Sequence, residues 1–350
     1  MSDVLVLRAL GLGDLLTSVP ALRGVRRAWP QARLTLAAPA VLGRWLCDLG
    51  LADDVLDVQG LDAGVPAGGR PLDVAVNLHG RGPRSHRVLG ALHPGRLVAY
   101  ACPRAGHDGP RWEDDEHEVD RWVRLVRCAG ALASPRDLRL PASGPREGHV
   151  VVHPGAASGS RRWPPERWAA VGRSLAATGY PVVVTGSAGE AALGASVCGA
   201  VPGAVDRCGR DDLPGLARVV GTAALVLSGD TGVAHLATAL GTPSVTLFGP
   251  ISPTLWGPRV DRHLHRALWA GTPRRPRPGN PHADVLDPLL ERVTVPEVLD
   301  AARELLSAGT DPCEPGPTAR PSARGGQPRE APASVPSRPS ATAPPEPSRS

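Results

Sequence analysis

Residues 4–17 read Val-Leu-Val-Leu-Arg-Ala-Leu-Gly-Leu-Gly-Asp-Leu-Leu-Thr, and this stretch decides the fold. The first four residues are a short apolar run, which is typical of a strand buried on both faces of a sheet. Gly11 and Gly13 then allow a tight turn, and apolar residues recur at helical spacing over residues 15–28. A buried strand, a glycine turn and a helix in this order begin a βαβ unit of a parallel sheet.

The same alternation continues along the chain. Further strands are predicted over residues 34–37, 55–58 and 73–78, with a helix over 40–48. Residues 133–148 are rich in Pro, Ser, Gly and Arg and predict a linker between two domains. A second series follows the linker, with strands predicted over 149–152, 181–185, 224–227 and 244–248 and helices over 165–178, 187–198, 211–220 and 233–240.

Two consecutive Rossmann-like units predict an α/β protein in which two such domains, residues 1–140 and 148–307, face each other across a cleft. Open α/β sheets bind ligands at the carboxyl ends of their strands, so the cleft is the expected site. Residues 258–288 are rich in Pro, Arg and His and predict an irregular surface excursion, followed by a final helix over 296–306. Residues 310–350 are mostly Pro, Ser, Ala and Arg and predict a disordered tail.

Composition excludes several classes of protein. The 350 residues carry 39 cationic side chains, all of them Arg, and 34 acidic ones. Part of the resulting net charge of +5 lies in the tail, so we expect no nucleic-acid partner. Six Cys residues form no CxxC pair, which argues against a disulfide framework or a zinc ribbon. No apolar stretch approaches the ~18 residues of a membrane span, and the N-terminus does not resemble a signal peptide. These features predict a cytoplasmic protein.

Three loops carry side chains suited to chemistry. The first ends at Asp14, which either caps the following helix or supplies a carboxylate at the cleft floor as a general base. The second, residues 153–165, combines small residues with Arg161 and Arg162, whose guanidinium groups suit a phosphate.

The third loop reads Leu-Ser-Gly-Asp-Thr-Gly-Val-Ala-His over residues 227–235. Backbone N–H groups at Thr231 and Gly232, with the Thr231 hydroxyl, form an anion-binding nest at a helix N-terminus. His235 alone would more often be structural, but it lies on the same element as Asp230, about one and a half helical turns further on.

In this order the three loops resemble glycosyltransferase family 9, the heptosyltransferases, which have the GT-B fold of two facing Rossmann-like domains. The resemblance covers residues 1–307 and rests on Gly-Asp-Leu-Leu at 13–16 with Pro-Ala-Leu at 20–22, the His-Pro-Gly…Arg-Trp-Pro loop, and Asp-Thr-Gly-x-x-His with Phe-Gly-Pro at 248–250. It implies an inverting, metal-independent enzyme that needs no cofactor and moves a sugar, typically heptose, from an ADP-sugar to a saccharide acceptor in cell-envelope glycan synthesis. We expect a monomer, and a lipid-linked acceptor would bring it to the inner face of the plasma membrane.

The resemblance also assigns roles. Residues 1–140 would bind the acceptor and residues 148–307 the nucleotide-sugar donor, with Asp14 as the base that deprotonates the acceptor hydroxyl. The residues expected on the donor side are Ser158, Arg161, Arg162, Asp230, Thr231, Gly232 and His235. Those expected on the acceptor side, where residues 77–86 follow a predicted strand, are Gly13, His79, Arg81 and His86.

Two departures from the family are visible. Arg161 stands where family members usually carry Lys, which keeps the charge but changes its geometry. Many relatives have a cysteine cluster near the C-terminal excursion, whereas residues 269–290 contain no Cys.

Other interpretations stay open. The acidic run at 113–118 could bind a metal, but an acid-rich first turn of a helix is the favoured interpretation. A GT-B epimerase or transferase that uses another nucleotide sugar would have the same fold, and a non-catalytic sugar-nucleotide binding protein would keep the same loops. A dinucleotide oxidoreductase is disfavoured because neither half has the complete glycine fingerprint.

Overall fold

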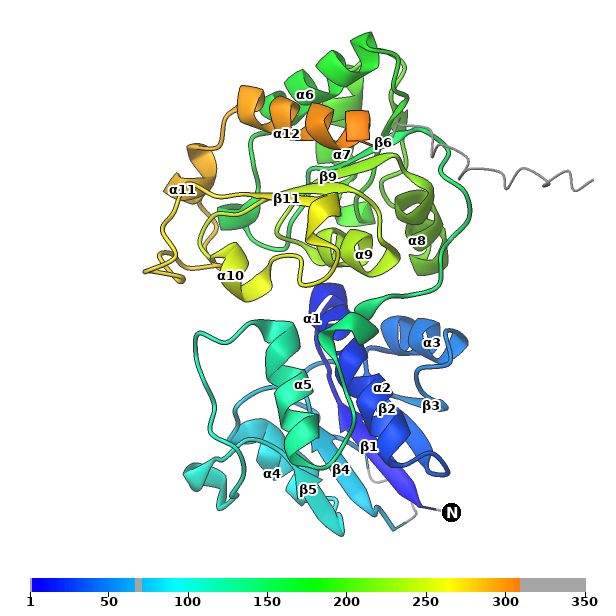
Figure 1. The fold of residues 1–350 in the computed structure, drawn as a ribbon, viewed down its shortest axis with the longest axis vertical. Coiled ribbons are helices and arrows are strands. Elements are labelled where there is room, and N and C mark those ends of the chain that lie inside the picture. Colours follow the sequence, from blue (N-terminus) through cyan, green and yellow to red (C-terminus); the bar gives the residue numbers. More distant parts are fainter. Residues whose placement is uncertain (1, 67–70, 309–350) are drawn as a thin grey trace, which may run out of the picture. The chain divides into compact units, whose positions relative to one another are not determined.

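A computed structural model describes residues 2–66 and 71–308 of the chain (Figure 1). The described residues all fall within one compact unit, which contains two parallel sheets. The predicted tail at 310–350 lies outside the described residues. The predicted α/β class is confirmed, and the two sheets define an N-terminal and a C-terminal lobe.

The N-terminal lobe is built on five parallel strands in the order β3-β2-β1-β4-β5. Val4 and Val6 of β1 pack into the core with α2 and α5, whereas Leu5 and Leu7 pack on the opposite face with Leu89 of α4. Figure 1 shows α2 and α5 side by side over the same face of this sheet. The elements of this lobe are β1 (Asp3–Leu7), α1 (Leu12–Thr17), α2 (Val19–Ala28), β2 (Arg33–Ala38), α3 (Ala40–Asp48), β3 (Asp54–Asp57), β4 (Val74–Asn77), α4 (Arg84–Gly90), β5 (Arg96–Val98), η1 (Pro103–Ala105), α5 (Glu118–Cys128) and η2 (Pro135–Leu138).

The helix predicted over residues 15–28 is in fact two helices. Ser18 ends α1 and precedes α2, and Pro20 lies in the first turn of α2. A proline lacks the N–H that a continuous helix would need and its ring clashes with the carbonyl four residues earlier, which explains the break. Because α1 already begins at Leu12, Asp14 lies inside its first turn.

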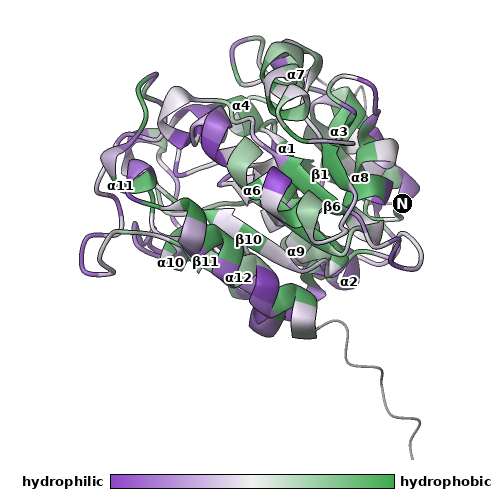
Figure 2. Ribbon diagram, turned by 90° about the horizontal axis from the view of Figure 1, so that it is seen from above, coloured by the Kyte–Doolittle hydropathy of each residue, from purple (hydrophilic) through white to green (hydrophobic). Residues whose placement is uncertain are grey.

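The C-terminal lobe is built on six parallel strands in the order β11-β10-β9-β6-β7-β8. Val150 and Val152 of β6 pack against α6 and α12, while Val151 faces α8 and α9. Figure 2 shows β1 and β6 in the apolar colour, whereas α12 mixes polar and apolar residues as a surface helix does. The elements of this lobe are β6 (Val150–His153), η3 (Gly159–Arg161), α6 (Pro165–Ala177), β7 (Val182–Val184), η4 (Ala188–Glu190), α7 (Ala191–Gly199), β8 (Val205–Asp206), α8 (Leu213–Thr222), β9 (Leu225–Gly229), α9 (Gly232–Leu240), β10 (Ser244–Leu247), α10 (Pro253–Trp256), η5 (Arg262–Leu264), β11 (His265–Leu268), α11 (Pro288–Glu291) and α12 (Val295–Ala308).

The prediction that residues 258–288 are wholly irregular is wrong, because β11 lies within them and pairs with β10 at the edge of the sheet. Its sequence, His-Arg-Ala-Leu, is short and half polar. Edge strands are often short and charged, so their sequence carries little of the apolar signal of a central strand.

The two lobes share packing. One hydrophobic cluster includes Leu22 and Leu46 of the N-terminal lobe and Val220 and Leu236 of the C-terminal lobe. The segment predicted as a linker is held by hydrogen bonds, such as that from the Leu140 N–H to the Ala239 carbonyl at 2.9 Å. The domain limits at residues 140 and 148 stay a prediction. None of the described helices has the length and apolar character needed to cross a membrane.

We predict that Leu22→Ala lowers the free energy of unfolding by about 2–5 kcal/mol, because Leu22 is fully buried and the change leaves a cavity. Val41→Ala is the matched control, since Val41 is 62% exposed and should change stability by less than about 0.5 kcal/mol. Urea denaturation followed by circular dichroism measures both. Equal effects in the two variants would show that α2 does not pack as described.

Candidate active site

A buried cation organises the N-terminal half of the site. Arg8 follows β1 directly and is 1% exposed. Its Nε donates to the Asp14 carbonyl at 2.9 Å, its Nη2 to Glu118 Oε1 at 2.9 Å, and its Nη1 to the Leu78 carbonyl. A buried charge is tolerated only when it is paired and hydrogen-bonded, so these contacts fix the end of β1 against α1 and α5.

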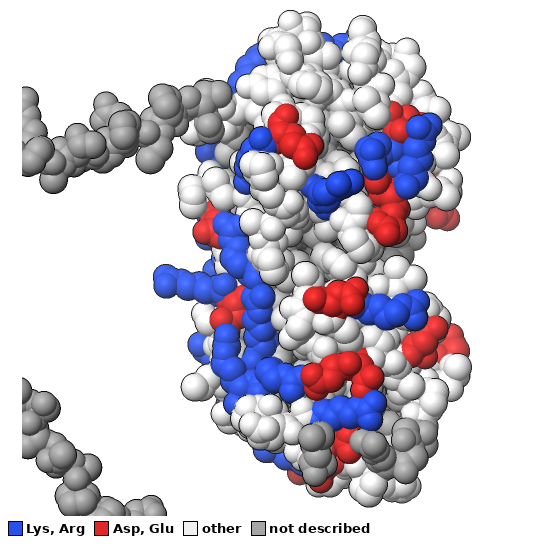
Figure 3. Space-filling model, turned by 90° about the vertical axis from the view of Figure 1, so that its right-hand side faces the viewer, with Lys and Arg blue, Asp and Glu red and all other residues white. Residues whose placement is uncertain are grey.

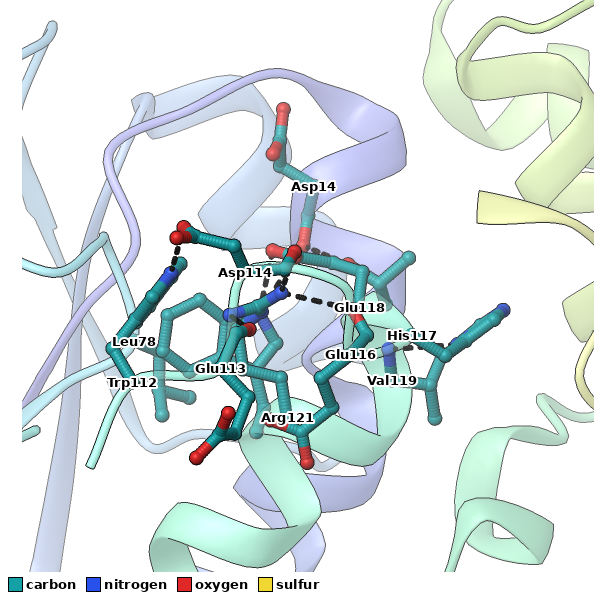
Figure 4. A network of polar contacts seen from close by, with 12 residues as sticks. Asp14, Leu78, Trp112, Glu113, Asp114, Glu116, His117, Glu118, Val119 and Arg121 are labelled. Atoms are coloured by element: carbon teal, nitrogen blue, oxygen red, sulfur yellow. Dashed lines mark hydrogen bonds and ion pairs between the residues drawn. The ribbon is translucent and has the colours of Figure 1, made fainter. Parts of the chain in front are cut away.

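Glu118, the first residue of α5, is the anion at the centre of this network (Figure 4). Besides Arg8 it accepts hydrogen bonds from Arg121 Nε at 3.2 Å and from Trp122 Nε1 at 2.8 Å. Burial acts to raise the pKa of Glu118, but the two guanidinium groups and the Trp122 hydrogen bond outweigh burial and hold it below its ordinary value. Glu118 is therefore ionised at neutral pH.

The sequence predicts that the acidic run at residues 113–118 forms the first turn of a helix. The structure contradicts this prediction for most of the run. Only Glu118 of the run lies in α5, and residues 113–117 form a loop. Carbonyl oxygens of that loop, at Glu113 and Glu116, accept from the guanidinium of Arg121 at 2.7 and 2.8 Å. The described residues contain no group of three or more His, Cys, Asp or Glu side chains placed to hold a metal ion.

Asp14 does not cap α1, because the N-cap is Gly11 and has no side-chain partner. The Asp14 side chain is 34% exposed, with Oδ1 3.3 Å from Arg8 Nη2. Figure 4 shows its carboxylate directed away from the Glu118–Arg121 network. Burial is the main cause that raises the pKa of Asp14, with help from Glu118, while Arg8 and Arg161 oppose it. A carboxylate with a raised pKa is a better proton acceptor once ionised.

The C-terminal lobe supplies Arg161 and Asp230 to the same place. Arg161 Nη1 donates to the Asp230 carbonyl at 3.1 Å, which joins the loop of η3 to the turn between β9 and α9. Burial raises the pKa of Asp230 to about 6; Arg161 opposes this shift and Asp14 adds to it. Arg161 and Asp14 both affect the pKa of Asp230 through their charges, so charged residues of the two lobes interact within one site.

Two polar groups in this corner are buried without a partner in the described part of the chain, the Nε of Arg161 and the hydroxyl of Thr231. Thr231 is the N-cap of α9, and its side chain makes no capping hydrogen bond. Buried polar groups are normally paired, so these are available to a ligand. The Ser160 hydroxyl is unpartnered in the same way, and the sequence did not single it out.

Close approach of α1 and α9 brings the lobes together. A Cβ added at Gly13 would lie 2.7 Å from His235 Cδ2, and one at Gly232 would lie 3.0 Å from the Cβ of Leu12. Only residues without a side chain fit there. His235 Nε2 is 3.9 Å from Asp230 Oδ1, and burial, with His117 next, lowers the pKa of His235 to about 4. His235 is therefore neutral at physiological pH.

The other donor-side candidates lie in the second loop. Ser158 precedes η3 and is partly exposed. Arg162 is exposed, and its Nε donates to the Ala156 carbonyl within the loop at 2.8 Å. The structure thus groups the predicted donor residues in two neighbouring turns joined by the Arg161–Asp230 contact.

The residues predicted on the acceptor side lie in different environments. His79 is half-buried, and burial, with Arg8 next, lowers its pKa to about 4. Arg81 is exposed and pairs with Asp114 at 3.3 Å. The prediction that His86 lies at the mouth of the lobe is wrong: the residue is 2% exposed, with ring nitrogens near the Tyr100 carbonyl at 2.8 Å and the Asn77 amide at 3.1 Å. The first turn of α4 directs His86 inward, where it supports the fold.

Sequence reasoning missed Arg8 and Glu118. A single arginine at the carboxyl end of an apolar strand is the signal that could have found Arg8, since a charge that enters a core implies a buried partner. Glu118 was noticed only as one of an acidic run.

We predict that Glu118→Gln destabilises the protein by about 3–5 kcal/mol, since it removes the anion from a buried pair with Arg8 and Arg121. Because the folded state lowers the pKa of Glu118, its contribution is present above the unfolded value of ~4.3 and is lost as the pH falls below it. Urea denaturation between pH 7 and pH 3 should show a flatter acid dependence in the variant. Glu304→Gln, at an exposed pair with Arg266, should behave as wild type, and a wild-type pH dependence in Glu118→Gln would contradict this assignment.

Comparisons with known proteins agree with this geometry. Residues 131–275 match the model of "Glycosyltransferase family 9 (heptosyltransferase)", a range that includes Arg161, Asp230 and His235 but not Asp14. Lipopolysaccharide heptosyltransferase 3 of Escherichia coli is 28% identical over 199 residues, which are 55% of this chain and 57% of the relative. The chain spans about half the length of the first curated relatives it matches.

Solved structures extend the likeness to both lobes. The family 9 glycosyl transferase of Veillonella parvula has a TM-score of 0.72 and 19% identity, over 88% of this chain and 98% of its own. ADP-heptose lps heptosyltransferase II of E. coli has a TM-score of 0.71 and 20% identity, over 88% of this chain and 99% of its own. These likenesses show the fold, which is GT-B. The resemblance of this chain to glycosyltransferase family 9 is therefore confirmed.

Proposed function

We propose that the chain is an inverting, metal-independent glycosyltransferase that moves a sugar from an ADP-linked donor to a saccharide or lipid-linked acceptor. By the resemblance the sugar is heptose and the product a cell-envelope glycan. The observation that carries the proposal is the meeting of a partly exposed Asp14 carboxylate from one lobe with the Arg161–Asp230 corner of the other. A transferase needs such a pairing of a base and a site for the leaving group across a cleft.

The donor's leaving diphosphate would lie at the N-terminus of α9. Backbone N–H groups at Gly232 and Val233 point out of the first turn of this nine-residue helix, where the helix dipole favours negative charge. The Nε of Arg161 and the Thr231 hydroxyl are already desolvated and lack a partner, so a phosphate oxygen could accept from both without displacing a protein contact. Stabilising the charge that develops on the leaving group is usually the greatest contribution that such a site makes to catalysis.

Asp14 would take the proton from the acceptor hydroxyl as it attacks the anomeric carbon. Inversion needs only one base in line with the leaving group, in contrast to the paired carboxylic acids of glycosidases. Arg8 holds Asp14 by its main-chain carbonyl at 2.9 Å and its carboxylate at 3.3 Å, which limits the orientations of the base. Asp230 is a weaker candidate because its side chain is only 11% exposed.

The remaining parts of the proposal concern partners and location. The N-terminal lobe would bind the acceptor and the C-terminal lobe the donor, with no cofactor and with the enzyme acting as a monomer in the cytoplasm, at the membrane where its acceptor is lipid-linked. Gly13, His79 and Arg81 are the acceptor-side residues that remain after His86 is placed in the core.

We predict that Asp14→Asn lowers the rate of transfer by about 10²–10⁴-fold, the range for loss of a general base, while the affinity for ADP changes by a few-fold at most. The assay follows nucleotide released from a panel of ADP-, UDP- and GDP-sugars, each measured with and without EDTA. Because burial raises the pKa of Asp14, wild-type activity should fall on the acid side at a pH above the ordinary carboxylate value of ~3.9.

Asp300→Asn, on the exposed surface of α12, is the control. Full activity in Asp14→Asn would exclude Asp14 as the base, and loss of activity with EDTA would exclude metal independence.

We predict that Arg161→Ala weakens ADP binding by about 1.5–3 kcal/mol, as loss of a charge-assisted hydrogen bond should. Arg161→Lys should restore part of the affinity because the charge is kept while one of the guanidinium contacts is lost. Isothermal titration calorimetry measures both variants beside Arg303→Ala, an exposed arginine of α12. Unchanged affinity in Arg161→Ala would remove this residue from the donor site, and tighter binding of NAD than of ADP would favour an oxidoreductase instead.

A further inference from the structure

A concave surface is lined by segments of both lobes. One cavity of about 770 Å³ and an adjacent one of about 540 Å³ share Pro135 and Arg259 in their walls. We call the two together the basic groove. Its charged lining residues are Arg124, Arg127, Arg136, Arg139, Arg259, Arg262, His263, Glu116, Asp120 and Asp261.

Each acidic residue of the basic groove is already paired with one of its arginines. The pairs are Glu116 with Arg124 at 2.7 Å, Asp120 with Arg259 at 2.7 Å and Asp261 with Arg139 at 2.6 Å. The arginines left over have no carboxylate partner in the part of the chain that the structure describes, and they are Arg127, Arg136 and Arg262. The groove therefore carries a local excess of positive charge.

Positive charge is also unevenly distributed over the surface. Arginine side chains gather in a band along one side of the face that Figure 3 shows, with few acidic side chains among them, whereas elsewhere on that face the two signs alternate. Clustered like charges repel each other unless a counter-charge is bound, so an unbalanced concave cluster favours an anionic ligand.

Part of the groove is fixed in place. Arg139 packs directly over Gly241, where an added Cβ would overlap the guanidinium, and its Nη2 bonds Asp261. Asp261 has a φ of 48°, in the left-handed region that non-glycine residues seldom occupy. A strained residue that persists is held by its surroundings, and such residues concentrate at binding sites.

We propose that the basic groove binds a soluble ligand that carries two or more phosphoryl groups. A guanidinium forms parallel hydrogen bonds to two phosphate oxygens. Three guanidinium groups without a carboxylate partner among the described residues, one lining the smaller cavity and two the larger, suit more than one phosphate. No described residue that lines either cavity is Trp, Tyr or Phe, so the stacking that single-stranded nucleic acid uses has no platform. A flat bilayer would reach only the projecting side chains and not the floor of the concave surface.

The basic groove is separate from the proposed donor site, and the proposal goes beyond the proposed transfer reaction. None of the residues assigned to the donor or to the base lines either cavity. The groove joins α5 and η2 of the first half of the chain to residues 259–263 of the second half. A multiply charged anion held by Arg136 and Arg262 would add an attraction between those two segments, which would hold the two lobes together.

The test is calorimetric titration of the full chain with inorganic tripolyphosphate. The double variant Arg136→Ala/Arg262→Ala should bind it at least about ten-fold more weakly, since it removes two charge-assisted contacts. Both residues are exposed, so the variant should keep the wild-type melting temperature. Higher salt should weaken binding to the wild type more steeply than to the variant.

Two further variants separate this site from the donor site. Arg161→Ala should leave the groove-dependent part of tripolyphosphate binding unchanged, and Arg303→Ala should bind as wild type. Protection of Arg136 and Arg262 from phenylglyoxal by tripolyphosphate, read by mass spectrometry, locates the ligand directly. Equal affinity in wild type and double variant, or no protection, would overturn the proposal. It would also be overturned if an oligothymidine or phosphatidylglycerol vesicles bound the wild type more tightly than tripolyphosphate and with the same dependence on Arg136 and Arg262.

Discussion

The buried guanidinium of Arg8 is the constraint on which the N-terminal half of the site depends. It stands at the end of β1, where a parallel sheet presents its ligand-binding edge, and it is hydrogen-bonded to three separate segments of the chain. Two of these acceptors are main-chain carbonyls and only Glu118 carries a charge, so removing Glu118 would leave a poorly compensated cation in the core. Glu118 supplies one negative charge to two guanidinium groups, those of Arg8 and Arg121, so these three side chains together keep a charge of +1. Asp14 balances the remaining positive charge from 3.3 Å away, and its side chain is still 34% exposed, so part of the carboxylate can be reached by a substrate.

The second constraint is the presence of glycine, which has no side chain, at positions 13 and 232 where α1 meets α9. Gly13 and Gly232 let the two helices approach closely enough for groups from both lobes to interact. The consequence is electrostatic: Asp14 raises the proton affinity of Asp230, while Arg161 lowers that of both carboxylates. Binding an anionic diphosphate beside Arg161 would reduce that cation's effect on Asp14 and raise its proton affinity further. The donor would then prepare the base for the acceptor, so that proton transfer becomes more favourable once both substrates are present.

Central features of the fold could be predicted from the sequence, and features at edges and ends could not. Strands such as β1 and β6 are buried on both faces, so their apolar runs have only one structural interpretation. The edge strand β11 is half polar, so its sequence did not predict a strand. The apolar pattern of residues 15–28 predicts one helix, but Pro20 interrupts it. Among the candidate site residues, spacing placed Arg161 and Asp230 on two loops that a hydrogen bond between these residues joins. It could not show that His86 turns inward, because a loop histidine and a core histidine look alike until the helix direction is known.

Arg161 stands where members of the family usually carry lysine. The exchange fits a composition without lysine, but it also has a structural consequence. A lysine ammonium has three N–H donors, but all of them lie at one nitrogen, whereas a guanidinium spreads its donors over three nitrogens that point in different directions. Arg161 uses Nη1 for the Asp230 carbonyl, and its Nε remains buried without a partner. One side chain can thus hold the η3 loop against the β9–α9 turn and still present a donor to the ligand. In the proposed reaction, a loop that is ordered before the nucleotide binds would lose less of the binding free energy to ordering, and more would remain for stabilising the charge that develops when the sugar leaves.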